Sequence, residues 1–153
     1  MSKTSVLFVC LGNICRSPHA EGIFKSKVEQ RGLGDKYNVD SCGTGSWHVG
    51  SPPHIESQAV AKQHSVSLAG QKSRQLADED FFNFDYIVAM DESNLRDIEA
   101  AAISEEPKMF CLRKFDPQAD SLCVPDPFYE GGFEGVFQMI ERSLEKFLDE
   151  LEA

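Results

Sequence analysis

The sequence predicts an α/β fold in one domain over residues 1–153, with a four-stranded parallel sheet flanked by helices on both faces. Four short segments are apolar and rich in β-branched or aromatic residues, and stretches of helical character separate them. Strands that are apolar throughout are typical of parallel sheets, whose two faces are covered by helices. The chain is long enough for one hydrophobic core, and no repeat or linker divides it.

The expected elements alternate along the chain. Strands are predicted over residues 5–9, 37–41, 86–90 and 109–112. Helices are predicted over residues 18–31, 55–64, 78–83, 91–101 and 133–151. Loops are expected over residues 42–53 and 114–132. Because ligands of parallel sheets bind beyond the carboxyl ends of the strands, we expect a site at Cys10, which follows the first strand.

The charge balance narrows the classes of partner. With 15 Lys and Arg against 25 Asp and Glu, the formal net charge is −10. Such a surface repels nucleic acid and anionic membranes, so neither is expected as a partner. No apolar run approaches the ~20 residues that span a bilayer, and the run over residues 6–9 is too short for a signal peptide. We therefore expect a cytoplasmic protein, as a monomer or weak dimer.

The cysteines and histidines do not form a familiar metal or disulfide pattern. There are five Cys and four His, with no Cys-x-x-Cys pair. An odd cysteine count in a cytoplasmic chain argues against a disulfide framework, and scattered histidines argue against zinc. We expect no metal and no other cofactor. His48, His54 and His64 are interpreted as surface residues without a role.

The segment between the first strand and the first helix carries the chemistry. Its Gly12 and Asn13 tolerate the positive φ of a tight loop, whose amides can form an anion-binding nest next to a helix N-terminus. Five residues separate Cys10 from Arg16, whose guanidinium can bind two phosphate oxygens at once. Ser17 can donate to the Cys10 sulfur and favour the nucleophilic thiolate. The expected phosphate contacts are Leu11, Gly12, Asn13, Ile14, Cys15, Arg16 and Ser17.

These residues resemble a known family. Cys10-Leu-Gly-Asn-Ile-Cys-Arg16-Ser17-Pro18 is similar to the signature loop of the low-molecular-weight protein tyrosine phosphatases, and it lacks the Gly-Lys-Ser/Thr ending of ATP-binding loops. The resemblance implies a Rossmann-like phosphatase fold. It also implies hydrolysis of phosphotyrosine in proteins, and of small aryl phosphates, through a phosphocysteine on Cys10.

The resemblance extends to a second segment, Asp126-Pro127-Phe128-Tyr129. The family has Asp-Pro followed by two aromatic residues here, which implies that Asp126 is the general acid and later the base. The family usually has two tyrosines, or a tyrosine and a varied aromatic residue, in this segment, and Phe128 lacks one of the two hydroxyls. Without the resemblance, the segment reads equally well as a plain Asp-Pro turn.

Further residues take expected roles from the same resemblance. Trp47, together with Phe128 and Tyr129, is expected to wall a slot for the phenyl ring, although an isolated loop Trp is more often a core residue. Asn13, Ser17 and Ser41 match a hydrogen-bond network that supports the loop from beneath. Gln71 falls near the place of a histidine in that network. The segment 85–94 matches a strand and the following helix, and we interpret it as architectural.

Cys15 has two interpretations. It is either a small apolar filler, or the partner of Cys10 in a reversible disulfide that protects the nucleophile from irreversible oxidation. The resemblance implies the second. Cys42, Cys111 and Cys123 are expected to be structural.

Three other functions stay open on the sequence. An arsenate reductase-like enzyme shares the Cys-x5-Arg loop, but it needs two further cysteines close together, and none occurs between Cys42 and Cys111. A non-catalytic phosphate-binding module, or an adaptor for a kinase, would have lost part of the catalytic set, and here none is missing.

Overall fold

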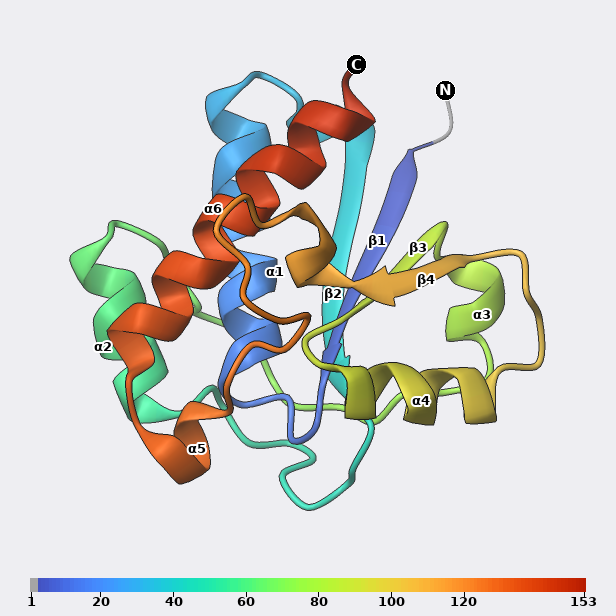
Figure 1. Cartoon of the computed structure of the whole chain (residues 1–153), viewed down its shortest axis with the longest axis horizontal. Helices are drawn as coiled ribbons and strands as arrows, with labels where there is room; N and C mark the ends of the chain where they lie inside the picture. Colours follow the sequence, from blue (N-terminus) through green and yellow to red (C-terminus); the bar gives the residue numbers. More distant parts are fainter. Residues whose placement is uncertain (1–2) are drawn as a thin grey trace.

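The computed structural model describes residues 3–153 and contains one parallel sheet in the strand order β2-β1-β3-β4 (Figure 1). Its strands are β1 (Thr4–Cys10), β2 (Tyr37–Gly43), β3 (Tyr86–Ala89) and β4 (Lys108–Cys111). The central strand β1 pairs with β2 and with β3, so that Cys10 lies opposite Gly43 and Val9 opposite Ala89. This confirms the predicted four-stranded parallel sheet.

Helices cover both faces of this sheet. They are α1 (Arg16–Gln30), α2 (Ile55–Gln63), α3 (Asp80–Asn83), α4 (Glu92–Ala101), α5 (Pro127–Glu130) and α6 (Phe133–Leu151), with 3-10 turns η1 (Gly34–Lys36) and η2 (Leu112–Phe115). In Figure 1, α1, α2 and α6 lie on one side of the strands, and α3 and α4 lie on the other.

The core explains this two-sided arrangement. Side chains of a strand point alternately to its two faces. Val6 and Phe8 of β1 therefore belong to the hydrophobic cluster under α1 and α6, whereas Leu7 and Val9 belong to the cluster under α3 and α4. All four are fully buried, as expected for the central strand of a covered sheet.

Element ends differ from the prediction in informative places. Helix α1 begins at Arg16, two residues before Pro18. Proline lacks a backbone N–H, and the first turn tolerates it because the N–H groups there have no acceptor within the helix. The segment 114–132, predicted as a loop, contains the end of η2 and the four-residue helix α5. So short a helix shows no hydrophobic periodicity. It forms because the Asp126 side chain caps it, accepting from the Phe128 amide, with Pro127 at its first position.

The carboxyl ends of the strands meet at one edge of the sheet. The chain leaves β1 toward α1 and β2 on one side, and β3 lies on the other side, so β1 and β3 diverge at a topological switch point. The segment after Cys10 and the segment after Ala89 therefore meet at this edge. Among residues 3–153, no helix is both long and apolar enough to cross a membrane.

Candidate active site

Cys10 ends β1 and lies at the base of a pocket on this edge. Its side chain is buried, and its Sγ lies 3.1 Å from the Ser17 hydroxyl. The backbone amide of Asn13 donates to the same sulfur at 3.3 Å. Hydrogen-bond donors around a sulfur favour the anionic form that attacks electrophiles. The geometry thus suits Cys10 as a nucleophile and later as a leaving group.

A buried polar network lies beneath the loop. The Asn13 side chain donates to Ser17 at 2.8 Å and to Ser41 at 3.0 Å, and it accepts from the Arg74 amide at 3.0 Å. Ser41 in turn donates to Glu21 at 2.6 Å. Asn13 has a φ of 56°, in the left-handed region that asparagine tolerates. These bonds hold the loop in the shape that its short hydrogen bonds to Cys10 require.

Three expectations about the loop and this network need correction. Gln71 does not join it, because its amide donates to the Pro18 carbonyl at 3.2 Å. Glu21, which no sequence motif indicated, is buried and takes part in the network. Gly12 does not have a positive φ. The side chains of Asn13 and Ser17, expected both to contact substrate and to support the loop, lie beneath it.

Arg16 is almost fully buried, with 2% of its side chain exposed. Its Nη1 donates to Asp91 Oδ2 at 2.6 Å and to the Val124 carbonyl at 2.9 Å, and its Nη2 lies 3.4 Å from Asp126 Oδ2. Its Nε is buried without a hydrogen-bond partner among the described residues. Burial opposes the charge, but Cys10, Asp91 and Asp126 outweigh it and raise the pKa of Arg16. The guanidinium is therefore charged and retains an unused donor for a ligand.

Asp91 is a site residue that the sequence did not reveal. The segment around it was interpreted as architectural, and Asp91 does cap α4 by accepting from the Asn94 amide at 2.7 Å. Its second oxygen holds Arg16. The available signal was its position directly after the third predicted strand, at the edge where Cys10 also lies.

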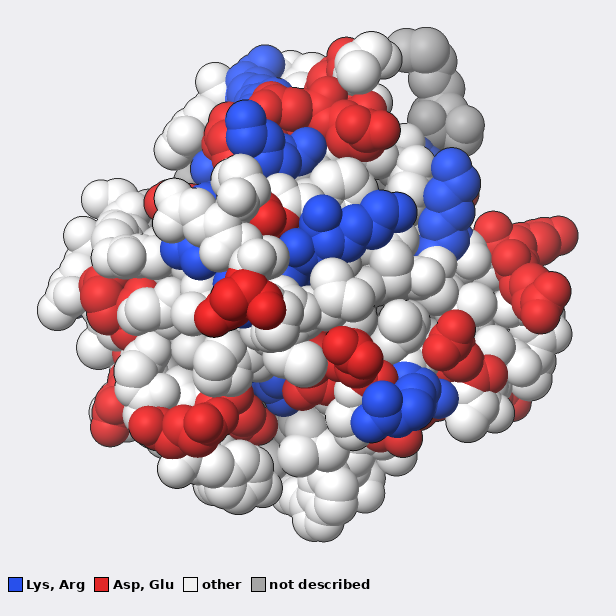
Figure 2. Space-filling view, in the orientation of Figure 1, with Lys and Arg blue, Asp and Glu red and all other residues white. Residues whose placement is uncertain are grey.

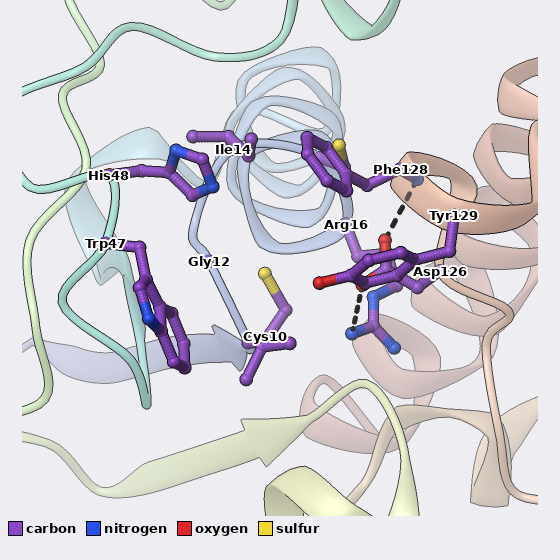
Figure 3. Close-up of a pocket in the computed structure, with 11 residues that line it drawn as sticks. Cys10, Gly12, Ile14, Arg16, Trp47, His48, Asp126, Phe128 and Tyr129 are labelled. Atoms are coloured by element: carbon purple, nitrogen blue, oxygen red, sulfur yellow. Dashed lines mark hydrogen bonds and ion pairs between the residues drawn. The ribbon is translucent and has the colours of Figure 1, made fainter.

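The pocket above Cys10 has a polar base and apolar walls. Figure 3 shows the Cys10 sulfur pointing between Trp47 and His48 on one side and Phe128 and Tyr129 on the other. The aromatic side chains at the mouth are partly free, with 73% of Trp47, 47% of Phe128 and 71% of Tyr129 exposed. The lining residues are Cys10, Leu11, Gly12, Ile14, Cys15, Arg16, Trp47, His48, Asp126, Phe128 and Tyr129.

His48 was expected to be a surface residue without a role, but the structure places it in the wall of the pocket. It lines the pocket, and its ring centroid lies 5.8 Å from that of Phe128. It also covers the phosphate loop, since a Cβ on Gly12 would lie 3.0 Å from its Cδ2. A lone histidine between glycines and prolines has no sequence signal that places it here. Its position at the pocket emerges only from the fold.

Cys15 is buried beside Ile14 and Phe133. Burial raises the pKa of its thiol to about 12. At neutral pH it is therefore a thiol. All five cysteines are free in this structure.

This combination of fold and loop matches known proteins. The sequence fits the model of the family described as low molecular weight phosphotyrosine protein phosphatase over residues 5–153, nearly the whole chain. The chain belongs to this family. The resemblance inferred from the two motifs is thereby confirmed.

Individual relatives agree with this assignment. Low molecular weight protein-tyrosine-phosphatase YfkJ of Bacillus subtilis is 42% identical over 145 residues, covering 94% of this chain and 93% of the relative. The crystal structure of YfkJ superposes with a TM-score of 0.95, covering 99% and 96% of the two chains at 40% identity. The human low molecular weight phosphotyrosine protein phosphatase is 41% identical over 150 residues, covering 95% and 94%.

A second structural relative carries a different substrate in its name. The crystal structure of DARP, drosophila arginine phosphatase, superposes with a TM-score of 0.90 at 37% identity, covering 97% of this chain and 98% of that one. Together the relatives confirm the prediction of a phosphatase enzyme and its α/β fold. None of the three is described as an arsenate reductase.

Proposed function

We propose that this enzyme hydrolyses phosphotyrosine in proteins, and small aryl phosphates, through a phosphocysteine on Cys10. The observation that supports this most directly is convergence. Cys10, Arg16 and Asp126 line one pocket, together with the aromatic side chains of Trp47, Phe128 and Tyr129. The Nε of Arg16 has no hydrogen-bond partner among the described residues. A nucleophile, an anion receptor and an acid are the three groups that such a reaction needs.

In the first step, the Cys10 thiolate donates an electron pair to phosphorus. The bond between phosphorus and the phenolic oxygen breaks, and the electron pair of that bond stays on the oxygen. Protonated Asp126 transfers its proton to this oxygen, so the alcohol leaves neutral. Arg16 and the loop amides bind the equatorial phosphate oxygens, whose charge they stabilise. The product is a phosphocysteine and a free tyrosine side chain.

In the second step, water attacks phosphorus while the Asp126 carboxylate accepts its proton. The sulfur–phosphorus bond breaks and Cys10 leaves as a thiolate, releasing inorganic phosphate. The Ser17 hydroxyl at 3.1 Å and the Asn13 amide at 3.3 Å stabilise the sulfur as its charge returns. Asp126 ends protonated, ready for the next cycle. One carboxyl serves both steps because its protonation state alternates.

The walls of the pocket support an aromatic substrate. Trp47, Phe128 and Tyr129 offer apolar faces above the phosphate loop, and aromatic rings pack favourably edge-to-face or offset against one another. The lower margin of the molecule in Figure 2 carries mostly uncharged side chains. In Figure 1, the loops that follow the carboxyl ends of the strands lie at this margin. Despite the net charge of −10, we infer that local contacts in this slot select the substrate.

A substrate profile tests the proposal. Peptides that carry phosphotyrosine, phosphoserine or phosphoarginine at the same place are compared with an aryl phosphate. We expect phosphotyrosine and the aryl phosphate to be turned over, with activity abolished in Cys10→Ser. We also expect Asp126→Asn to slow turnover by roughly 10²- to 10⁴-fold for poor leaving groups. Retained hydrolysis in Cys10→Ser would overturn the mechanism, and a preference for phosphoarginine would reassign the substrate.

A further inference from the structure

His54 links the phosphate loop to the segment that carries Asp126. Its imidazole ring stacks on Phe133 with centroids 4.9 Å apart and meets Phe128 edge-on at 6.2 Å. Phe128 also contacts His48 at 5.8 Å. The Phe128 ring of the proposed acid segment is therefore flanked by two imidazoles, His48 and His54, which both come from the segment between β2 and α2.

The other contacts of His54 anchor it to the base of the site. Its backbone amide donates to the Ile14 carbonyl of the phosphate loop at 2.7 Å. Phe133, on which its ring stacks, belongs to a buried cluster with Ile14 and Cys15. Its Nδ1 accepts from the Glu56 amide at 3.1 Å and so caps α2. His54 thus has a position determined by the phosphate loop itself.

Phe128, in turn, determines where the Asp126 carboxylate lies. Its amide donates to Asp126 Oδ1 at 3.0 Å, two residues away. Helix α5 is only four residues long, and Gly131 and Gly132 follow it with φ of 73° and 77°. Glycine adopts such φ values without steric cost, so no side chain of these two residues fixes the segment. The contacts of the Phe128 ring with His48 and His54 hold this short segment over the pocket, together with the 3.4 Å contact between Asp126 and Arg16.

We propose that His54 is a positioning residue for the general acid: its ring seats Phe128, and thereby holds Asp126 at the distance at which it protonates the leaving group. This rests on the proposed role of Asp126. His54 does not touch the reacting atoms, and it does not line the pocket. His48 completes the seat from the side of Trp47, as Figure 3 shows for His48 and Phe128.

The proposal has a kinetic signature. A displaced general acid hardly slows the reaction of a substrate whose leaving phenol has a low pKa, because that phenolate leaves without a proton. It slows the reaction strongly when the leaving phenol has a high pKa. Loss of the contact between the His54 ring and Phe128 must therefore steepen the dependence of kcat/KM on the leaving-group pKa. A general structural defect lowers all rates by a similar factor and leaves this slope unchanged.

Two substitutions separate the ring from the cap. His54→Asn retains a side chain that caps helices well but removes the ring, whereas His54→Phe retains a ring and removes the acceptor. Across a series of aryl phosphates, we expect His54→Asn to lose on the order of tenfold on the most basic leaving groups and little on the most acidic. His54→Phe is expected to keep the wild-type slope, with only its melting temperature lowered. Equal slopes in the Asn and Phe variants would overturn the proposal.

Two reference variants complete the experiment. His64 follows the last residue of α2, and its ring stacks on Phe137 with centroids 4.3 Å apart. His64→Asn removes this second stacked imidazole and should leave the slope unchanged. Asp126→Asn should steepen the slope more than any other variant. If Asp126→Asn steepens it and His54→Asn does not, the role of His54 alone is refuted. If Asp126→Asn has no effect, the role of Asp126 is refuted and the role of His54 with it.

Discussion

Asp91 and Arg16 form a partly buried ion pair that joins the two halves of the sheet, with Oδ2 and Nη1 2.6 Å apart. Asp91 follows β3 and Arg16 follows the loop after β1, so the pair spans the switch point. Asp91 fixes one edge of the guanidinium, which leaves Nε available to a ligand. The pair therefore orients the residue that grips phosphate.

Replacing this carboxylate while keeping the helix cap tests its role. Asp91→Asn can still accept from the Asn94 amide, because asparagine caps helices as well as aspartate does. Arg16 loses its charged partner and its preferred orientation. We expect kcat/KM to fall on the order of 10- to 100-fold, about 1.4–2.8 kcal/mol, with weaker inhibition by inorganic phosphate. Steady-state kinetics measure both, and an unchanged phosphate inhibition constant would contradict this role.

Gly43 is expected to be irreplaceable because the phosphate loop passes over it. A Cβ at this position would lie 2.8 Å from the Leu11 carbonyl oxygen and 3.1 Å from the Gly12 carbonyl carbon. Gly43→Ala must displace that backbone, so we expect a destabilisation of about 1–3 kcal/mol together with reduced activity.

Gly135 provides the matched control for Gly43. It lies inside α6, and a Cβ there meets nothing within 4 Å. Gly135→Ala should raise stability by about 0.5–1 kcal/mol and leave activity unchanged. Thermal or urea unfolding compares the two variants, and equal effects would show that the approach of the loop to Gly43 is unimportant.

His19 predicts a dependence of stability on pH. It is fully buried, its Nε2–H donates to the Ser57 carbonyl at 2.9 Å, and burial lowers its pKa to about 4. An unfolded histidine has a pKa of about 6.5, so protons bind the unfolded chain more readily between these two values. The contribution of neutral His19 is complete above about pH 6.5 and is lost as the pH falls toward 4.

Urea unfolding at several pH values measures this contribution. We expect the free energy of unfolding of the wild type to fall by up to about 3 kcal/mol more than that of His19→Gln between pH 6.5 and 4. Glutamine does not titrate, so the free energy of unfolding of the variant falls only through the titration of other groups. Parallel curves for the two proteins would refute the assignment.

Cys15 is expected to protect Cys10 from peroxide. Peroxide oxidises the Cys10 thiolate to sulfenic acid, and the Cys15 thiol then displaces water from that sulfur to form a disulfide. Because the pKa of Cys15 is about 12, Cys10 reacts first. After mild peroxide, mass spectrometry should find a Cys10–Cys15 link, and a thiol reductant should restore activity. In Cys15→Ser, recovery should fail, and sulfinic acid alone in the wild type would refute the switch.

Local patterns sufficed for much of the fold and part of the site. Apolar β-rich runs predicted all four strands, and the spacing of Cys10 and Arg16 predicted the phosphate loop. The role of Asp126 followed only from the family resemblance, because the local pattern reads equally well as a plain turn; the structure places Asp126 3.4 Å from Arg16. The same reasoning missed Asp91, His48 and His54, because each stands in a segment with an ordinary capping or loop pattern.

The sequence by itself determined the succession of strands and helices along the chain and the chemistry of the phosphate loop. Both depend on residues that lie close together along the chain. Only the tertiary structure decided what surrounds Arg16. Asp91 and Asp126 lie 75 and 110 positions away from it, and no local preference encodes such distances. The same holds for the imidazoles around Phe128. Their approach results from burial of the two core clusters against a twisted sheet, which brings separate loops to one edge.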